Sequence, residues 1–104
     1  MTLEQLNGIL KQTGLPTAYD CFENETVPPY IAYIEVGRNP IIADNIVYAE
    51  TKTINIELYT DKKSPDHEKK LEDILTESGL IYTFDEVGLI ESENIYEVIY
   101  TVEI

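Results

Sequence analysis

The sequence predicts an α+β fold: a single domain spanning residues 1–104, in which two helices pack on one face of an antiparallel or mixed sheet of four or five strands. Three observations predict this class. Two segments have apolar residues at helical spacing, and other segments alternate apolar and polar residues as strands do. In addition, Ile, Val, Thr and Tyr make up 38 of the 104 residues, and these side chains suit a pleated sheet. The expected order is helix, two or three strands, helix, two strands.

The first helix is expected over residues 2–13. Thr2 and Gln5 have the spacing of a capping box, in which each side chain bonds to the backbone amide of the other residue. The apolar residues that follow recur every three or four positions: Leu3, Leu6, Ile9 and Leu10. Gly14 and Pro16 then end the helix, because neither residue continues one easily.

The second helix is expected from Pro65 to Ser78. Ser64 suits the N-cap position, and proline is favoured at the first helical position. The buried stripe of this helix consists of Leu71, Ile74 and Leu75, and Gly79 ends it. Two pairs of opposite charge are spaced four residues apart on the exposed side: Asp66 with Lys70, and Lys69 with Asp73.

Five segments are expected as strands, namely residues 18–22, 30–36, 46–60, 80–87 and 94–104. The second of these is apolar on both alternating faces, as in a strand near the centre of a sheet. The third alternates most clearly, and its more polar first half is expected to extend beyond the core. The segment Gly37–Asn45 contains Gly, Pro, Asp and Asn residues, which indicates a loop. The last two segments are expected to form a closing hairpin.

The chain is strongly acidic, with 20 Asp and Glu against 7 Lys and Arg and a net charge of −13. Direct sequence-specific nucleic-acid binding is not expected, because contacts with phosphates need clustered Lys and Arg. Docking on an anionic membrane is not expected for the same reason. Thirteen of the 20 acidic residues follow residue 52, so the negative charge is concentrated in the second half of the chain.

The sequence carries no sign of membrane insertion or secretion. No apolar run approaches the roughly 20 residues of a transmembrane helix. Met1–Gln5 have neither the basic nor the apolar region of a signal peptide. Cys21 is the single cysteine, expected as a small half-buried residue that forms no internal disulfide. These features favour a reduced, cytoplasmic setting.

Residues suited to catalysis are scarce. His67, the one histidine, is expected to be a solvated residue in the first turn of an acidic helix. A nucleophilic pair of Cys21 and His67 lacks a third group that would orient it. Glu91 and Glu93 are expected to keep a turn soluble. Because metal-ligand spacings and phosphate-binding glycine loops are also missing, we expect no enzyme activity, no catalytic or metal-binding residues and no cofactor.

Two features favour contacts between proteins. Four of the seven basic residues gather around the second helix: Lys62, Lys63, Lys69 and Lys70. From charge alone they are a solubilising helix edge, and the alternative is a patch complementary to the acidic surface of a second copy. Four tyrosines exceed what one small core needs, and tyrosine is enriched at protein interfaces: Tyr30, Tyr33, Tyr48 and Tyr59.

Several stretches together resemble a known family. They are Gly14–Phe22 followed by Pro28–Ile31, then Ala43–Tyr48, and then Ile56–Lys63 leading into the second helix and Tyr96–Val98. The chain resembles, over nearly its whole length, the tail-completion or head–tail joining proteins encoded in siphophage and prophage morphogenesis clusters of Gram-positive bacteria. These proteins are similar to tail terminators, which are non-enzymatic α+β subunits that close a ring, often a hexamer, at the head-proximal end of the tail tube.

The resemblance implies a function, partners and a location. The protein would stop polymerisation of the tail tube and join the tail to the head connector, while DNA passes through the ring. Its partners would be further copies of itself, the major tail tube protein and the head connector protein, in the host cytoplasm during assembly and then in the virion. The Gly37–Asn45 loop would be an adaptable contact region. The candidate assembly residues are Arg38, Asn39, Asp44, Asn45, Tyr48, Lys62, Lys63, Lys69 and Lys70.

Two alternatives stay open. The first is an acidic inhibitor that mimics DNA and occupies the nucleic-acid groove of a host enzyme. It ranks lower, because a mimic needs carboxylates in rows at phosphate-like spacing, and the acidic residues here are spread over helix, turns and strands. The second is a carboxylate-dependent enzyme that uses Glu91 and Glu93, for which the sequence suggests no substrate.

Overall fold

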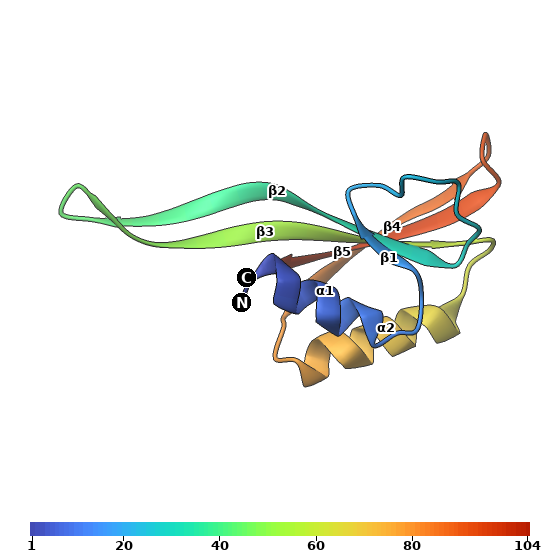
Figure 1. Cartoon of the computed structure of the whole chain (residues 1–104), viewed down its shortest axis with the longest axis horizontal. Coiled ribbons are helices and arrows are strands. Elements are labelled where there is room, and N and C mark those ends of the chain that lie inside the picture. The colour runs from blue at the N-terminus through green and yellow to red at the C-terminus, as the bar shows by residue number, and fades with distance from the viewer.

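The computed structural model of the protein describes all residues, 1–104. Its elements follow the order α1 (Leu3–Lys11), β1 (Thr17–Tyr19), β2 (Tyr30–Ala43), β3 (Ile46–Thr60), α2 (Pro65–Glu77), β4 (Tyr82–Ile90) and β5 (Ile95–Glu103). The strands form one five-stranded sheet in the order β1-β2-β3-β5-β4, with β1 parallel to β2 and the other pairs antiparallel. Both helices lie against the same face of this sheet (Figure 1). The predicted α+β class is confirmed, and the element order is close to the predicted one.

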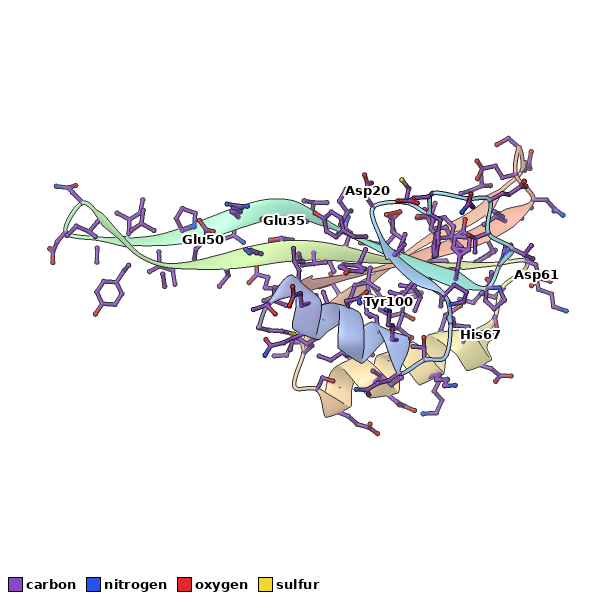
Figure 2. The ribbon with its side chains drawn as sticks, viewed as in Figure 1. Asp20, Glu35, Glu50, Asp61, His67 and Tyr100 are labelled. Carbon is purple, nitrogen blue, oxygen red and sulfur yellow. The ribbon has the colours of Figure 1, made fainter.

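The core lies between the helices and the face of the sheet that they cover. Twelve buried side chains form it: Leu6, Leu10, Ile31, Tyr33, Ile54, Ile56, Leu58, Leu71, Leu75, Val98, Tyr100 and Val102. Both helices contribute buried leucines, as their apolar spacing predicts, and β3 and β5 contribute every second residue. Tyr100 lies in this layer between sheet and helices (Figure 2), and its hydroxyl donates a 2.6 Å hydrogen bond to Glu72.

The two helices begin differently. The capping box before α1 is confirmed: the Thr2 hydroxyl accepts from the Gln5 amide at 3.1 Å, and the Gln5 side chain accepts from the Thr2 amide at 2.8 Å. Ser64 occupies the N-cap position of α2 as predicted, but its side chain does not cap the helix. The Ser64 hydroxyl lies instead 2.6 Å from Nδ1 of His67, so this histidine is bonded at the start of the helix.

The predicted loop at Gly37–Asn45 is wrong. β2 continues through this segment, and its pairing with β3 ends only at Ala43 and Ile46. The turn consists of Asp44 and Asn45 alone, with φ angles of +51° and +63°. Two-residue hairpin turns require such angles, and Asp and Asn tolerate them better than other side chains do. The long neighbouring strand β3 supplies backbone partners that outweigh the Gly and Pro signals in this segment.

Two smaller expectations are also corrected. β1 ends at Tyr19, because Asp20 takes a positive φ of 65° and turns the chain away. Cys21 is therefore exposed in a loop instead of half-buried in a strand. β2, in contrast, is an interior strand beside the central strand β3, as its apolar faces predict. The two strands of the closing hairpin form as predicted, although β4 begins and ends a few residues later than expected.

Candidate functional site

A two-stranded ribbon extends from the sheet well beyond the helices (Figure 1). We call this ribbon, residues 37–52, the hairpin arm. It makes the molecule 51 Å long, against 29 and 24 Å in the other two directions. Backbone hydrogen bonds from the C-terminal strand reach β3 no further out than Lys52, which pairs with Ile104, so the arm beyond Lys52 has no third strand. All residues from Arg38 to Glu50 are exposed to solvent.

The outer part of the hairpin arm is apolar on both of its faces. Three successive cross-strand pairs consist of apolar residues: Ile41 with Ala49, Ile42 with Val47, and Ala43 with Ile46. Successive residues of a strand point to opposite faces, so neither face of the ribbon is polar here. Tyr48 adds a ring that is 80% exposed. Exposed apolar surface of this kind is typical of sites that contact another protein, a membrane or a ligand.

The base of the hairpin arm is polar and is bonded within the chain. Arg38 Nε lies 2.6 Å from a carboxylate oxygen of Glu35, and its guanidinium is 3.9 Å from Glu50 (Figure 2 labels both carboxylates). The hydrogen bond from Arg38 lowers the pKa of Glu35. Asn39 donates one hydrogen bond to Thr53 at 2.9 Å and another to the carboxylate of Glu103 on β5. These contacts fix the base of the hairpin arm to the sheet.

The nine predicted assembly residues fall into two separate groups. Five lie on the hairpin arm: Arg38, Asn39, Asp44, Asn45 and Tyr48. The four lysines lie on α2 or on the link before it. Asp61, which precedes that link, is at the opposite end of the molecule from Glu50 of the arm (Figure 2). The structure therefore does not bring the lysines and the arm together within one copy.

The lysines do not form one free patch. Lys63 bonds to Glu68 on α2 at 2.9 Å and also to Glu86 on β4. The hydrogen bond from Lys63 lowers the pKa of Glu86. The predicted pair of Lys69 with Asp73 forms at 3.1 Å. The other predicted pair on α2 does not form, so two of the four lysines, Lys62 and Lys70, have no ion-pair partner.

The four surplus tyrosines have three different environments. Tyr33 is buried in the core, and Tyr48 is exposed on the hairpin arm. Tyr30 and Tyr59 are cross-strand neighbours on the face of the sheet away from the helices, which we call the outer face. Their rings stack with centroids 4.9 Å apart. The arm and the outer face thus hold the tyrosines that the core does not use.

A pair of carboxylates on the outer face was missed by sequence reasoning. The strand register places Glu57 of β3 diagonally beside Glu97 of β5, and the hydroxyl of Tyr59 donates to Glu57 at 2.8 Å. Glu97 is only 7% exposed. Burial, followed by the hydrogen bond with Glu57, raises the pKa of Glu97 to about 7. The two glutamates are 40 positions apart in the sequence, so only the register between β3 and β5 reveals the pair.

The residues that could support catalysis are not brought together. His67 lies on α2, whereas Cys21 follows Asp20 in a loop on the outer face, so the sheet separates them (Figure 2). Glu91 and Glu93 lie in the exposed turn between β4 and β5. No group of three or more His, Cys, Asp or Glu side chains is arranged to hold a metal ion. Neither helix has the length and apolar character needed to cross a membrane.

Comparison with known proteins does not name a family. No protein-family model matches the chain, and no curated protein matches it.

Proposed function

We propose that this protein is a non-enzymatic assembly subunit that caps a siphophage tail tube and joins it to the head connector as a ring of identical copies. The observation that carries the proposal is the hairpin arm, whose outer part is exposed and apolar on both faces. An isolated two-stranded ribbon is marginally stable in water, so a partner that covers both faces would stabilise it. The sequence resemblance supplies the phage context.

The shape of the subunit supports a ring. The hairpin arm leaves one end of an elongated molecule, while the helices and the acidic β4–β5 turn lie towards the other end (Figure 1). A contact between two different surfaces of the same chain is head-to-tail, and such contacts close into rings when the rotation between copies permits. Burial of the apolar pairs of the arm against neighbouring subunits would supply about 25 cal/mol for each Å² removed from water.

The charge of the chain is compatible with a ring around DNA. A net charge of −13 on each copy gives a ring a strongly negative field. Carboxylates and phosphates repel each other, so DNA could pass through the opening without adhering to it. Residues 85–103 contain six acidic side chains and no Lys or Arg. The five that are exposed are the best candidates for the lining of the opening: Asp85, Glu86, Glu91, Glu93 and Glu103.

Mass measurement in solution, alone and with purified tail tubes, tests this proposal. We expect the protein to join the tube ends as a ring, and we expect the double variant Ile42→Thr with Val47→Thr to lose this binding. Threonine retains the β-propensity of these positions and makes the outer part of the hairpin arm more polar. Ile81→Thr is the matched control, because Ile81 is 91% exposed but lies outside the hairpin arm.

Two results would contradict the proposal. One is a protein that stays monomeric and never joins tubes. The other is an arm variant that joins them as well as the Ile81→Thr control. Capture of a host nuclease or polymerase by the protein would instead support the acidic DNA-mimic alternative.

A further inference from the structure

The outer face carries a cavity of about 510 Å³ that is separate from the hairpin arm. It lies between the loop of residues 20–29, which crosses the sheet opposite the helices (Figure 1), and the β4–β5 turn. Three aromatic rings line it: the stacked pair of Tyr30 and Tyr59, and Phe22, whose ring meets that of Tyr30 edge-on with centroids 5.2 Å apart. The volume is in the range of sites that bind small molecules or single side chains of a partner.

The polar lining of this cavity is negative. Asp20 and Glu25 from the loop and Glu93 from the β4–β5 turn line it, and no Lys or Arg does. Asp20 projects on the side of the sheet away from the helices (Figure 2). Burial and the nearby charges of Glu93, Glu97 and Glu57 raise the pKa of Tyr30, so carboxylates from β3, β5 and the turn converge on the ring at the wall of the cavity.

These carboxylates have no counter-charge of their own. None of the three carboxylates that line the cavity forms an ion pair, and neither do Glu57 and Glu97 beside Tyr59. Glu97 lies buried beside Tyr59, behind the lining of the cavity and not in it. A cationic ligand against the three lining carboxylates would reduce the repulsion within a chain of net charge −13.

We propose that this cavity binds the guanidinium group of an arginine side chain presented by a partner protein. A guanidinium is planar and weakly hydrated, so it stacks on tyrosine rings, and its five N–H donors reach several carboxylates at once. A lysine ammonium is a compact point charge and uses such a site less completely. No three of the carboxylates are grouped to hold a metal ion, which also favours an extended organic cation. The proposal goes beyond the function of the hairpin arm and does not depend on it.

NMR titration of the whole protein with N-acetyl-arginine amide tests the site directly. We expect saturable shifts confined to residues around the cavity, including Tyr30, Tyr59 and Glu93. N-acetyl-citrulline amide is the neutral control, because it has nearly the shape of the arginine probe without its charge. Citrulline shifts of equal size, or arginine shifts spread over the whole acidic surface, would overturn the proposal.

Two variants in one turn separate a built site from general attraction to an acidic protein. Glu93→Gln removes a carboxylate that lines the cavity, whereas Glu91→Gln removes one two residues away that does not. Both change the net charge by one. We expect Glu93→Gln to weaken arginine binding by about threefold or more and Glu91→Gln to leave it nearly unchanged.

Equal weakening by the two glutamine variants would overturn the assignment. The arm variant Ile42→Thr with Val47→Thr should still bind the arginine probe, since its changes lie far from the cavity. A loss of ring formation in the arm variant and a loss of arginine binding in the Glu93→Gln variant are therefore separate outcomes.

Discussion

Glu97 is a buried carboxylate in a chain that already has a large negative charge. Val98 and Tyr100 of the same strand point into the core, and alternation turns Glu97 to the outer face beside Tyr59. Loss of water and the proximity of Glu57 disfavour its ionised form, which raises the pKa of Glu97 to about 7. The ordinary value of a glutamate in an unfolded chain is about 4.3. Folding therefore opposes the ionisation of this group.

The first prediction is that Glu97→Gln stabilises the protein at high pH. Because the folded-state pKa of Glu97 lies above the unfolded value, its protonated form favours folding below about pH 4, and this contribution is lost as the pH rises through about 7. The variant should gain about 1–2 kcal/mol in the free energy of unfolding at pH 8, where the parent protein carries an ionised carboxylate at this buried position. It should gain little at pH 4.

Urea unfolding of both proteins at the two pH values measures this difference. Glu103→Gln is the control, because Glu103 points to the same face of β5 but is exposed. If Glu103→Gln gives the same gain at pH 8, general charge repulsion and not the burial of Glu97 is responsible.

The second prediction concerns Leu75, a fully buried residue of α2 in the shared core. Leu75→Ala should lower the free energy of unfolding by about 2–5 kcal/mol, because it removes buried methyl groups and leaves a cavity. Ile81→Ala is a suitable comparison and should change stability little, since Ile81 is almost fully exposed. A loss near zero for Leu75→Ala would mean that α2 buries a different face.

At the scale of elements, Lys63 connects the start of α2 to the edge strand β4. Its ammonium bonds to Glu68 and Glu86 and lies 5.6 Å from the ring centroid of Phe84. The third prediction is that Lys63→Met lowers the melting temperature by about 2–5 °C in low salt and by less in high salt, since partly exposed ion pairs are weak and screened. Lys62→Met, which removes a lysine without an ion pair, should have almost no effect. Equal effects of the two changes would rule out this connection.

The hairpin arm is the element that contributes least to the core. The fourth prediction is that replacing residues 39–51 by Asn-Gly, a two-residue hairpin turn, leaves the fold intact. The free energy of unfolding should change by no more than about 1 kcal/mol, because the removed residues bury almost nothing in the isolated protein. Circular dichroism and urea unfolding test this. A loss above about 2 kcal/mol would show that the arm supports the sheet.

For the whole molecule, charge repulsion is a general cost of folding. The fifth prediction is that the melting temperature rises by several degrees between about 0.01 M and about 0.5 M NaCl, as the screening length falls from about 30 Å to a few Å. KCl at equal ionic strength should give the same rise, which distinguishes screening from the binding of one particular cation. A melting temperature that stays constant or falls with salt would contradict this view.

Local signals predicted most of the elements. The capping box of Thr2 and Gln5, the proline that begins α2 and the alternation along β5 each depend on residues close in sequence, and the structure confirms them. The Gly and Pro of the segment Gly37–Asn45 are local loop signals, and they predict a loop where the structure has a strand. Its strand conformation depends on pairing with β3, which the segment itself does not reveal.

The candidate sites were predicted less well. The tyrosine surplus indicated contact surfaces, and Tyr48 is indeed exposed on the hairpin arm. The clustering of the lysines did not indicate that Lys63 forms ion pairs with Glu68 and Glu86 of its own chain. The cavity beside Tyr30 and Tyr59 was not foreseen, because its lining comes from four separate segments of the chain.

The sequence by itself determined the fold class, the two helices, most of the strand positions and the acidic character of the surface, because periodicity, helix caps and charge are properties of neighbouring residues. Only the tertiary structure decided that residues 37–52 form an arm, that Glu57 meets Glu97, and that aromatic rings and carboxylates line one cavity. Each of these depends on which strands pair and in what register. Alternation specifies the face on which a residue lies but not its neighbour on the next strand.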